Sequence, residues 1–74
     1  MYAQYYPILI MLRLMQVVER TGLSRSTIYN MLNPDSEQYD PRFPKQVRVG
    51  SGAVRWIESE INAWLEECVK SSRG

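Results

Sequence analysis

The 74-residue sequence contains no histidine and a single cysteine, Cys68. One cysteine cannot form a disulfide within the chain, which argues against a secreted, disulfide-stabilised scaffold. The usual zinc-ligand sets need several Cys or His side chains, and a Ser-His or Cys-His nucleophilic pair needs a histidine. We therefore expect a cytoplasmic protein that has no cofactor, no metal site and no catalytic residues, and that is not an enzyme.

The chain also lacks an apolar run long enough to cross a bilayer. The most apolar stretch, YYPILIMLRL over residues 5–14, is far shorter than the roughly 20 residues of a membrane helix. No basic residue precedes it and no small-residue cleavage site follows it, so it does not resemble a signal peptide. We expect no membrane partner. Residues 1–11 are interpreted as an N-terminal leader whose apolar side chains offer a surface for self-association.

The net charge of +1 gives little sign of a polyanionic partner, but the charges are segregated along the chain. Residues 42–55 carry only basic charges, and residues 58–67 carry only acidic ones. The basic set is Arg42, Lys45, Arg48 and Arg55, and the acidic set is Glu58, Glu60, Glu66 and Glu67. Such segregation can give a nearly neutral molecule a face for a polyanion. The alternative, that these are solvated surface charges without a partner, stays open.

Hydrophobic periodicity predicts the order strand, helix, turn, helix, loop, hairpin, helix. The expected elements are a strand at 12–14, helices at 15–20, 24–33 and 57–69, a loop at 34–44 and a β-hairpin at 45–56. Gly22 suits the left-handed end of the first helix, and Ser24 suits the N-cap of the second. The predicted fold class is α+β, a small winged helix-turn-helix domain over residues 12–70 with a tail at 71–74.

The strongest local motif is the helix-turn-helix sequence VVERTGLSRSTIYNML, residues 17–32. Short polar side chains at the start of its second helix allow that helix to enter a major groove, and Arg25 can bond a guanine edge or a phosphate. The candidate DNA contacts in this helix are Ser24, Arg25, Ser26, Thr27 and Tyr29. Two alternatives remain. In the first, the two helices only pack against each other and Ser24 is a structural cap. In the second, Tyr29 packs against Phe43 or Tyr39 instead of contacting a phosphate.

The predicted hairpin supplies a second set of basic side chains. Arg48 and Arg55 alternate with valines, so we expect both to project from its solvent face, as in a wing that lies along the DNA backbone or enters the minor groove. The candidate wing contacts are Lys45, Arg48, Ser51 and Arg55. The alternative is a plain surface hairpin whose arginines pair with Glu58 or Glu60.

The aromatic residues and the cysteine are interpreted as structural. Trp56 and Trp64 are expected to anchor the core rather than to stack on bases. Phe43 is expected to fasten the preceding loop to that core. The spacing of the last predicted helix puts Cys68 on its apolar face, so we expect it to be buried and inert.

Two stretches, LRLMQVVERTGLSRSTIYNML and FPKQVRVGSGAVRWIESEINAWLEE, resemble the AlpA family of prophage regulators. More broadly, they are similar to the excisionase-like, winged members of the MerR-type DNA-binding superfamily. The resemblance covers about residues 12–67. It implies a winged helix-turn-helix fold, DNA binding in a phage or mobile element, and the helix and wing contacts given above. The plain wing tip, GSGA, departs from relatives that carry an extra basic residue there, and the apolar N-terminal stretch lies outside the match.

The resulting hypothesis is a sequence-specific regulator that binds double-stranded DNA. Its role would be transcriptional regulation of an integrase gene, excision of the element, or both. A domain this small covers few base pairs, so useful affinity would need cooperative binding of further copies at repeated sites or bending of the DNA. Integrase or RNA polymerase are candidate partners. The alternative is a protein-interaction adaptor that uses the acidic last helix to bind a recombinase or a response regulator.

Overall fold

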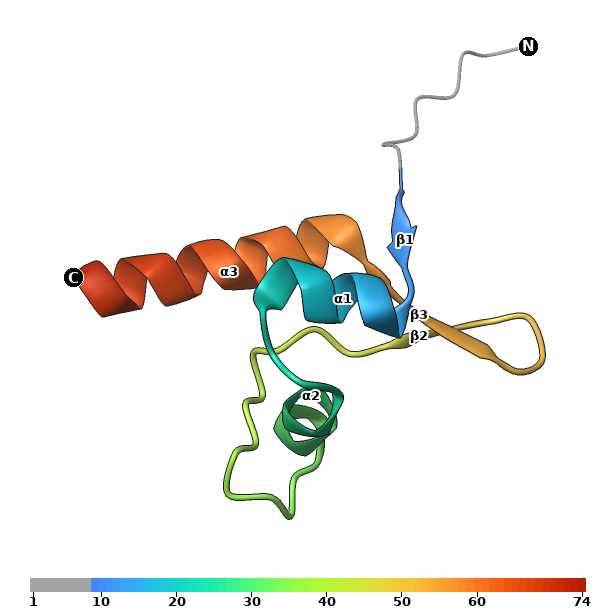
Figure 1. Cartoon of the computed structure of the whole chain (residues 1–74), viewed down its shortest axis with the longest axis horizontal. Coiled ribbons are helices and arrows are strands. Elements are labelled where there is room, and N and C mark those ends of the chain that lie inside the picture. The colour runs from blue at the N-terminus through green and yellow to red at the C-terminus, as the bar shows by residue number, and fades with distance from the viewer. Residues whose placement is uncertain (1–8) are drawn as a thin grey trace, which may run out of the picture.

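The computed structural model describes residues 9–74 and confirms the α+β class. The described residues form three helices and one antiparallel three-stranded sheet of order β1-β3-β2 (Figure 1). The elements are β1 (Met11–Leu12), α1 (Leu14–Thr21), α2 (Arg25–Leu32), β2 (Val47–Val49), β3 (Ala53–Ile57) and α3 (Glu58–Arg73). Residues 1–8 of the predicted leader lie outside the described residues, and so does most of the surface suggested for self-association.

The turn between α1 and α2 forms as predicted. Gly22 adopts a φ of 74° and its N–H donates to the Val18 carbonyl at 2.8 Å, which ends α1. Ser24 then caps α2, because its Oγ accepts a hydrogen bond from the Thr27 N–H at 3.1 Å. The two local signals therefore fix where α1 stops and where α2 begins.

The first strand is shorter than the predicted 12–14. It pairs Met11 with Ile57 and Leu12 with Trp56 and then stops. Arg13 is instead the N-cap of α1, and its backbone N–H donates to Gln16 Oε1 at 2.8 Å. Leu14 is thus the first residue of the helix, because this bond offers the backbone a helical start in place of a further strand pair.

The core gathers one side chain from every described element except β2, and one from the loop between α2 and β2. Six residues are at most 2% exposed: Leu12, Val17, Ile28, Phe43, Trp56 and Ile61. This confirms the structural interpretation of Trp56 and Phe43. Trp64 lies at the edge of the core, half-buried, with its ring against Phe43 in an edge-to-face arrangement at 4.9 Å.

Asp40 fastens the loop between α2 and β2 to the rest of the domain. Its carboxylate accepts hydrogen bonds from the Trp64 indole N–H at 3.1 Å and from the Arg42 backbone N–H at 2.9 Å. Its own N–H donates to the Met31 carbonyl of α2 at 3.0 Å. Burial by itself would raise the pKa of Asp40, but these two donors and the nearby Arg42 charge outweigh it and lower that pKa.

We therefore expect Asp40 to contribute to the acid stability of the fold. A lowered native pKa stabilises the folded state at pH values above the ordinary value of 3.8, and this stabilisation is lost as the pH falls through the native pKa. Asp40→Asn should be less stable than wild type at pH 7 and should lose less stability between pH 5 and pH 2.5. Thermal unfolding across that range measures the difference, and superimposable acid profiles for the two proteins would contradict the assignment.

The last helix is longer than predicted and leaves Cys68 uncovered. We expected a helix at 57–69 with Cys68 buried, but α3 extends to Arg73 and Cys68 is exposed. Figure 1 shows why: the C-terminal half of α3 projects beyond α1 and the 33–46 loop, so no other described element covers its apolar face. No helix within residues 9–74 is long and apolar enough to span a membrane.

Candidate nucleic-acid interface

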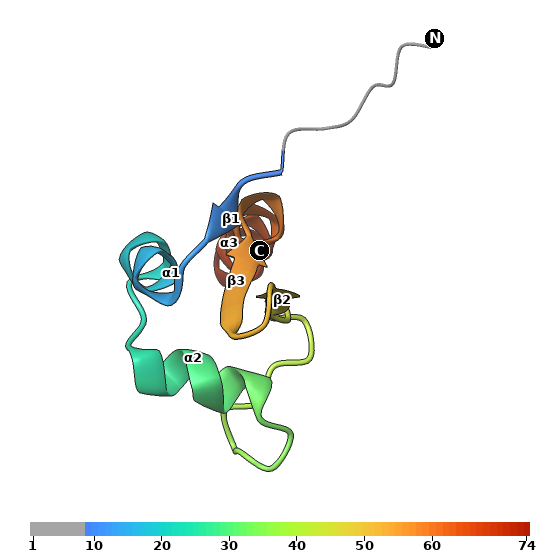
Figure 2. The same cartoon turned by 90° about the vertical axis from the view of Figure 1, so that its right-hand side faces the viewer.

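The second helix of the helix-turn-helix lies at the opposite side of the domain from α3. Both views place α2 beyond α1 and the sheet (Figure 2). The loop after α2 is hydrogen-bonded to its C-terminal half, and the outer side of its N-terminal half is left uncovered. At its start, Ser24, Arg25 and Ser26 are exposed and Thr27 is half-buried. Both hydroxyls of the cap are occupied, because Ser24 Oγ also donates to Thr27 Oγ1 at 2.9 Å. Ser24 and Thr27 thus shape the helix end, while Arg25 and Ser26 present side chains to solvent.

Arg25 is the only arginine in α2 and lies in its first turn. One nitrogen of its guanidinium, Nη2, donates to Met15 Sδ of α1 at 3.5 Å. No ion pair to Arg25 occurs within residues 9–74. Its full positive charge and most of its N–H donors are therefore available to a ligand at the helix N-terminus.

Tyr29 lies one turn after Arg25 on the same helix face. Its side chain is 45% exposed, so it is not part of the buried core. Residues four apart on a helix are neighbours at the surface, and Arg25 and Tyr29 therefore belong to one patch. The apolar stripe of α2 points the other way, with Ile28 buried and Met31 and Leu32 packed against the core.

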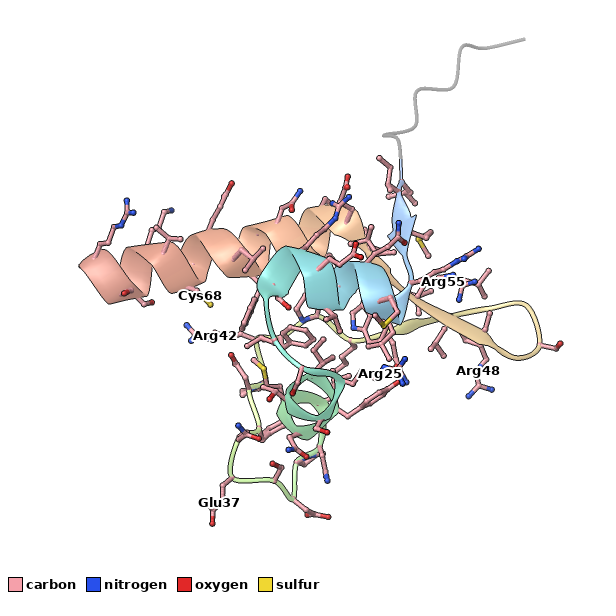
Figure 3. The ribbon with its side chains drawn as sticks, in the orientation of Figure 1. Arg25, Glu37, Arg42, Arg48, Arg55 and Cys68 are labelled. Atoms are coloured by element: carbon pink, nitrogen blue, oxygen red, sulfur yellow. The ribbon has the colours of Figure 1, made fainter. Side chains whose placement is uncertain are left out.

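We expected the two arginines of the hairpin to project from one face, and this prediction is wrong. Its register pairs Arg48 with Val54 and Val47 with Arg55. Directly opposed residues share a face and neighbours along a strand alternate, so Arg48 and Arg55 lie on opposite faces. Figure 3 agrees: Arg48 projects on the side of α2 and Arg25, whereas Arg55 projects on the side of β1. The cause is the three-residue turn 50–52. Because its length is odd, even-numbered residues of β2 share a face with even-numbered residues of β3, so Arg48 and Arg55 are separated.

Neither hairpin arginine has an acidic partner in the part of the chain that the structure describes. Glu58, which was the alternative partner, instead forms an ion pair with Arg20 of α1. Arg48 is exposed, and Arg55 is half-buried with its Nη1 donating to its neighbour's carbonyl, that of Val54, at 2.8 Å. β1 pairs with β3 only through Met11 and Leu12, and the chain enters α1 directly afterwards. The hairpin face opposite Arg48 therefore carries Arg55.

The remaining residues of the basic segment point elsewhere. Lys45 lines an open groove of about 810 Å³ between the 41–47 segment and α3, where Glu60 and Glu67 also contribute. Arg42 pairs with Asp40 at 3.6 Å, and in Figure 3 it lies on the side of the domain away from the hairpin tip. Ser51 is exposed at that tip. Residues 42–55 thus form no single basic face. The predicted wing contact at Lys45 lies on the groove beside α3, apart from Arg48 and Arg55.

One residue at the interface was not predicted from the sequence. Met15 contacts Arg25. This contact joins side chains ten positions apart on different helices, and periodicity carries no signal for it.

Comparison with known proteins assigns this fold to a family. The family model described as "Prophage CP4-57 regulatory protein (AlpA)" matches residues 10–69. The chain belongs to this AlpA family. It is 49% identical over 59 residues to the protein named "DNA-binding transcriptional activator AlpA" of Escherichia coli (strain K12), which covers 80% of this chain and 84% of that protein.

A second relative comes from a phage. The chain is 41% identical over 54 residues to "Uncharacterized protein ORF88" of Enterobacteria phage P4, covering 73% of this chain and 54% of that protein. No solved structure matches the chain. The family description and the name of the E. coli relative denote regulatory proteins and not enzymes, in agreement with the prediction that this chain is a regulator without catalytic activity.

Proposed function

We propose that this AlpA-family protein is a sequence-specific regulator that binds double-stranded DNA with α2 in the major groove and the β2–β3 hairpin in the adjacent minor groove. The observation that carries the proposal is Arg25, an exposed arginine without an acidic partner in residues 9–74, at the uncovered N-terminal end of α2. The printed name of the E. coli relative, a DNA-binding transcriptional activator, supports the same class of function.

The start of α2 suits base recognition. A major groove about 12 Å wide admits an α-helix, and the small side chains of Ser24 and Ser26 let the helix end approach the bases. Arg25 would then form two parallel hydrogen bonds to the O6 and N7 atoms of a guanine. Tyr29, one turn further on, would donate its hydroxyl to a phosphate and fix the register of the helix.

The opposed arginines of the hairpin support a wing that enters the minor groove edge-on. A ribbon in this groove, about 6 Å wide, has one phosphate backbone beside each of its faces. Arg48 would contact one DNA strand, and Arg55 would contact the other. A hairpin lying flat along one backbone would need its cations on a single face, and the register gives the opposite arrangement.

Removing either hairpin arginine should weaken binding without changing sequence preference. Arg48→Ala and Arg55→Ala should each reduce the slope of log affinity against log salt by about 1, because each variant releases about one fewer counterion. Phosphate-ethylation interference should show that the two variants lose contacts on different DNA strands. Arg73→Ala, a distant exposed arginine of α3, is the control with the wild-type slope. Loss of contacts on the same strand for both variants would exclude the edge-on wing.

Footprinting of the purified protein on DNA around its own gene tests the proposed function and its finer role. Protection of a promoter next to an integrase gene would assign transcriptional regulation, and protection at the element's attachment site would assign excision. Repeated half-sites filled together would indicate cooperative binding of several copies, which a domain of this size needs for useful affinity. Binding to no site more tightly than to random DNA, at any salt from about 50 to 200 mM, would refute the proposal.

A second candidate function, a protein-interaction adaptor, is favoured by the groove beside α3. Its floor is apolar, with Phe43 and Trp64, and its rim carries Lys45 opposite Glu60 and Glu67. A recombinase or response regulator would be the partner under this alternative. Glu60→Lys and Glu67→Lys separate the two functions: they should leave binding to the footprinted site intact if the protein acts through DNA alone, and should abolish regulation in the cell if it acts through a protein partner.

A further inference from the structure

Met15 is an exposed methionine that lies outside the hydrophobic core. It lies in the first turn of α1, and its side chain is 49% exposed, whereas the buried residue of that helix is Val17. The only hydrogen bond to its side chain within residues 9–74 comes from Arg25, whose Nη2 lies 3.5 Å from Met15 Sδ. Met15 therefore contacts the guanidinium that the proposed function assigns to base recognition.

We propose that Met15 is a positioning residue that holds the Arg25 guanidinium in the orientation in which it reads DNA. This inference rests on the proposed function of Arg25. An arginine side chain has many rotamers, and ordering it on binding costs affinity. A contact that selects the useful rotamer in the free protein removes part of that cost.

The chemistry of a thioether suits this role better than that of a carboxylate. Sulfur in methionine is a weak, polarisable acceptor, so it can hold an N–H without neutralising the charge of the guanidinium. Neither α1 nor α2 has an acidic residue in its first turn. An acidic side chain at position 15 would form an ion pair with Arg25 that DNA would have to break.

The geometry also leaves the DNA-binding edges of Arg25 usable. A guanidinium has five N–H donors, and Met15 engages only one nitrogen, Nη2. The remaining donors on Nη1 and Nε, and the second hydrogen of Nη2, can still form a parallel pair of bonds to a guanine. Met15 thus contacts the Arg25 guanidinium from α1, and the remaining N–H donors of the guanidinium can still bond DNA.

The first test is made on the free protein. In a sample with ¹³C-methyl-labelled methionine, the Met15 methyl resonance should shift in Arg25→Ala, while the resonances of Met11 and Met31 should not. An unchanged Met15 resonance would show that the contact is not populated in solution and would overturn the inference without any appeal to DNA binding.

The second test measures sequence preference with matched variants on the footprinted DNA site. Met15→Leu keeps the volume of the side chain and removes the acceptor, and it should lower affinity for the site by about 3- to 10-fold while affinity for random DNA stays the same. Met15→Gln, which restores a neutral acceptor of similar length, should recover most of that loss. Met11→Leu makes the same chemical change on β1, away from Arg25, and should bind like wild type.

A double-mutant cycle separates positioning from other roles. In the Arg25→Ala background, Met15→Leu should have no further effect on binding. A loss that persists there, or one that is equal for specific and random DNA, would mean that Met15 touches DNA or supports the fold, and would overturn the inference. If wild type and Arg25→Ala differ in site preference but Met15→Leu equals wild type, only the role of Met15 fails. If wild type itself has no site preference, the proposed function fails and this inference with it.

Discussion

Arg25→Ala should remove most of the sequence preference of the protein. We expect its affinity for the footprinted site to fall by about 5- to 150-fold, the value of one bidentate arginine–guanine contact of about 1–3 kcal/mol. Affinity for random DNA should fall much less, because the loss of one positive charge near the phosphates changes mainly the salt-dependent part of binding. Competition binding with the specific site and a scrambled duplex measures both quantities in one experiment.

Arg25→Lys distinguishes a base contact from a phosphate contact at the same position. Lysine retains the charge but lacks the planar fork, so it should fail like alanine in discrimination if Arg25 reads a guanine. It should behave almost like wild type if Arg25 only touches a phosphate. Arg73→Ala, at the far end of α3, loses the same charge as Arg25→Ala and serves as the control for that variant. Preference retained in both Arg25 variants would make the helix-turn-helix a scaffold and would favour the adaptor function.

The helix-turn-helix was predictable from sequence because its signals are local. Gly22 is needed where the backbone turns left-handed, and Ser24 is needed where a free N–H must be satisfied, and both form their hydrogen bonds within four residues of their own position. The boundary of β1 was less predictable. The competition between one more strand pair and a capped start of α1 is decided by Gln16, whose side chain returns to the Arg13 N–H.

The faces of the hairpin were predicted wrongly although the decisive signal is present in the sequence. We treated the valines on both strands as one buried face. The turn Gly50-Ser51-Gly52 has three residues, so Val49 lies opposite Ala53. With this register, odd-numbered residues of one strand lie opposite odd-numbered residues of the other, and even opposite even. Val47 therefore shares a face with Arg55, and Arg48 shares one with Val54. Counting the turn residues would have separated the two arginines.

The exposure of Cys68 marks a limit of periodicity as evidence. The spacing of Ile61, Leu65 and Cys68 correctly identifies an apolar face of α3, and Ile61 is buried as expected. Whether that face is covered depends on how far the neighbouring elements reach, and here they end before the last turns of the helix (Figure 1). The Met15–Arg25 contact has the same origin, since it depends on how α1 and α2 cross.

Trp56→Ala should destabilise the fold more than any of the other substitutions. Trp56 is fully buried at the centre of the core, and truncating a buried aromatic side chain costs about 3–5 kcal/mol. A domain of 74 residues has a total stability of about 4–11 kcal/mol, so the variant should lose a large part of it, and specific DNA binding should weaken in proportion to any unfolded fraction. Urea unfolding followed by circular dichroism measures the change.

Trp56→Phe shows whether packing or hydrogen bonding makes this residue important. Within residues 9–74 the buried Trp56 Nε1 has no hydrogen-bond partner, so removing it forfeits no such bond and even relieves an unsatisfied donor. The phenylalanine variant should therefore lose less than half as much stability as the alanine variant and should keep its DNA preference. Equal destabilisation by the two substitutions would instead mean that the indole N–H has a partner, such as a buried water, whose loss destabilises the folded state.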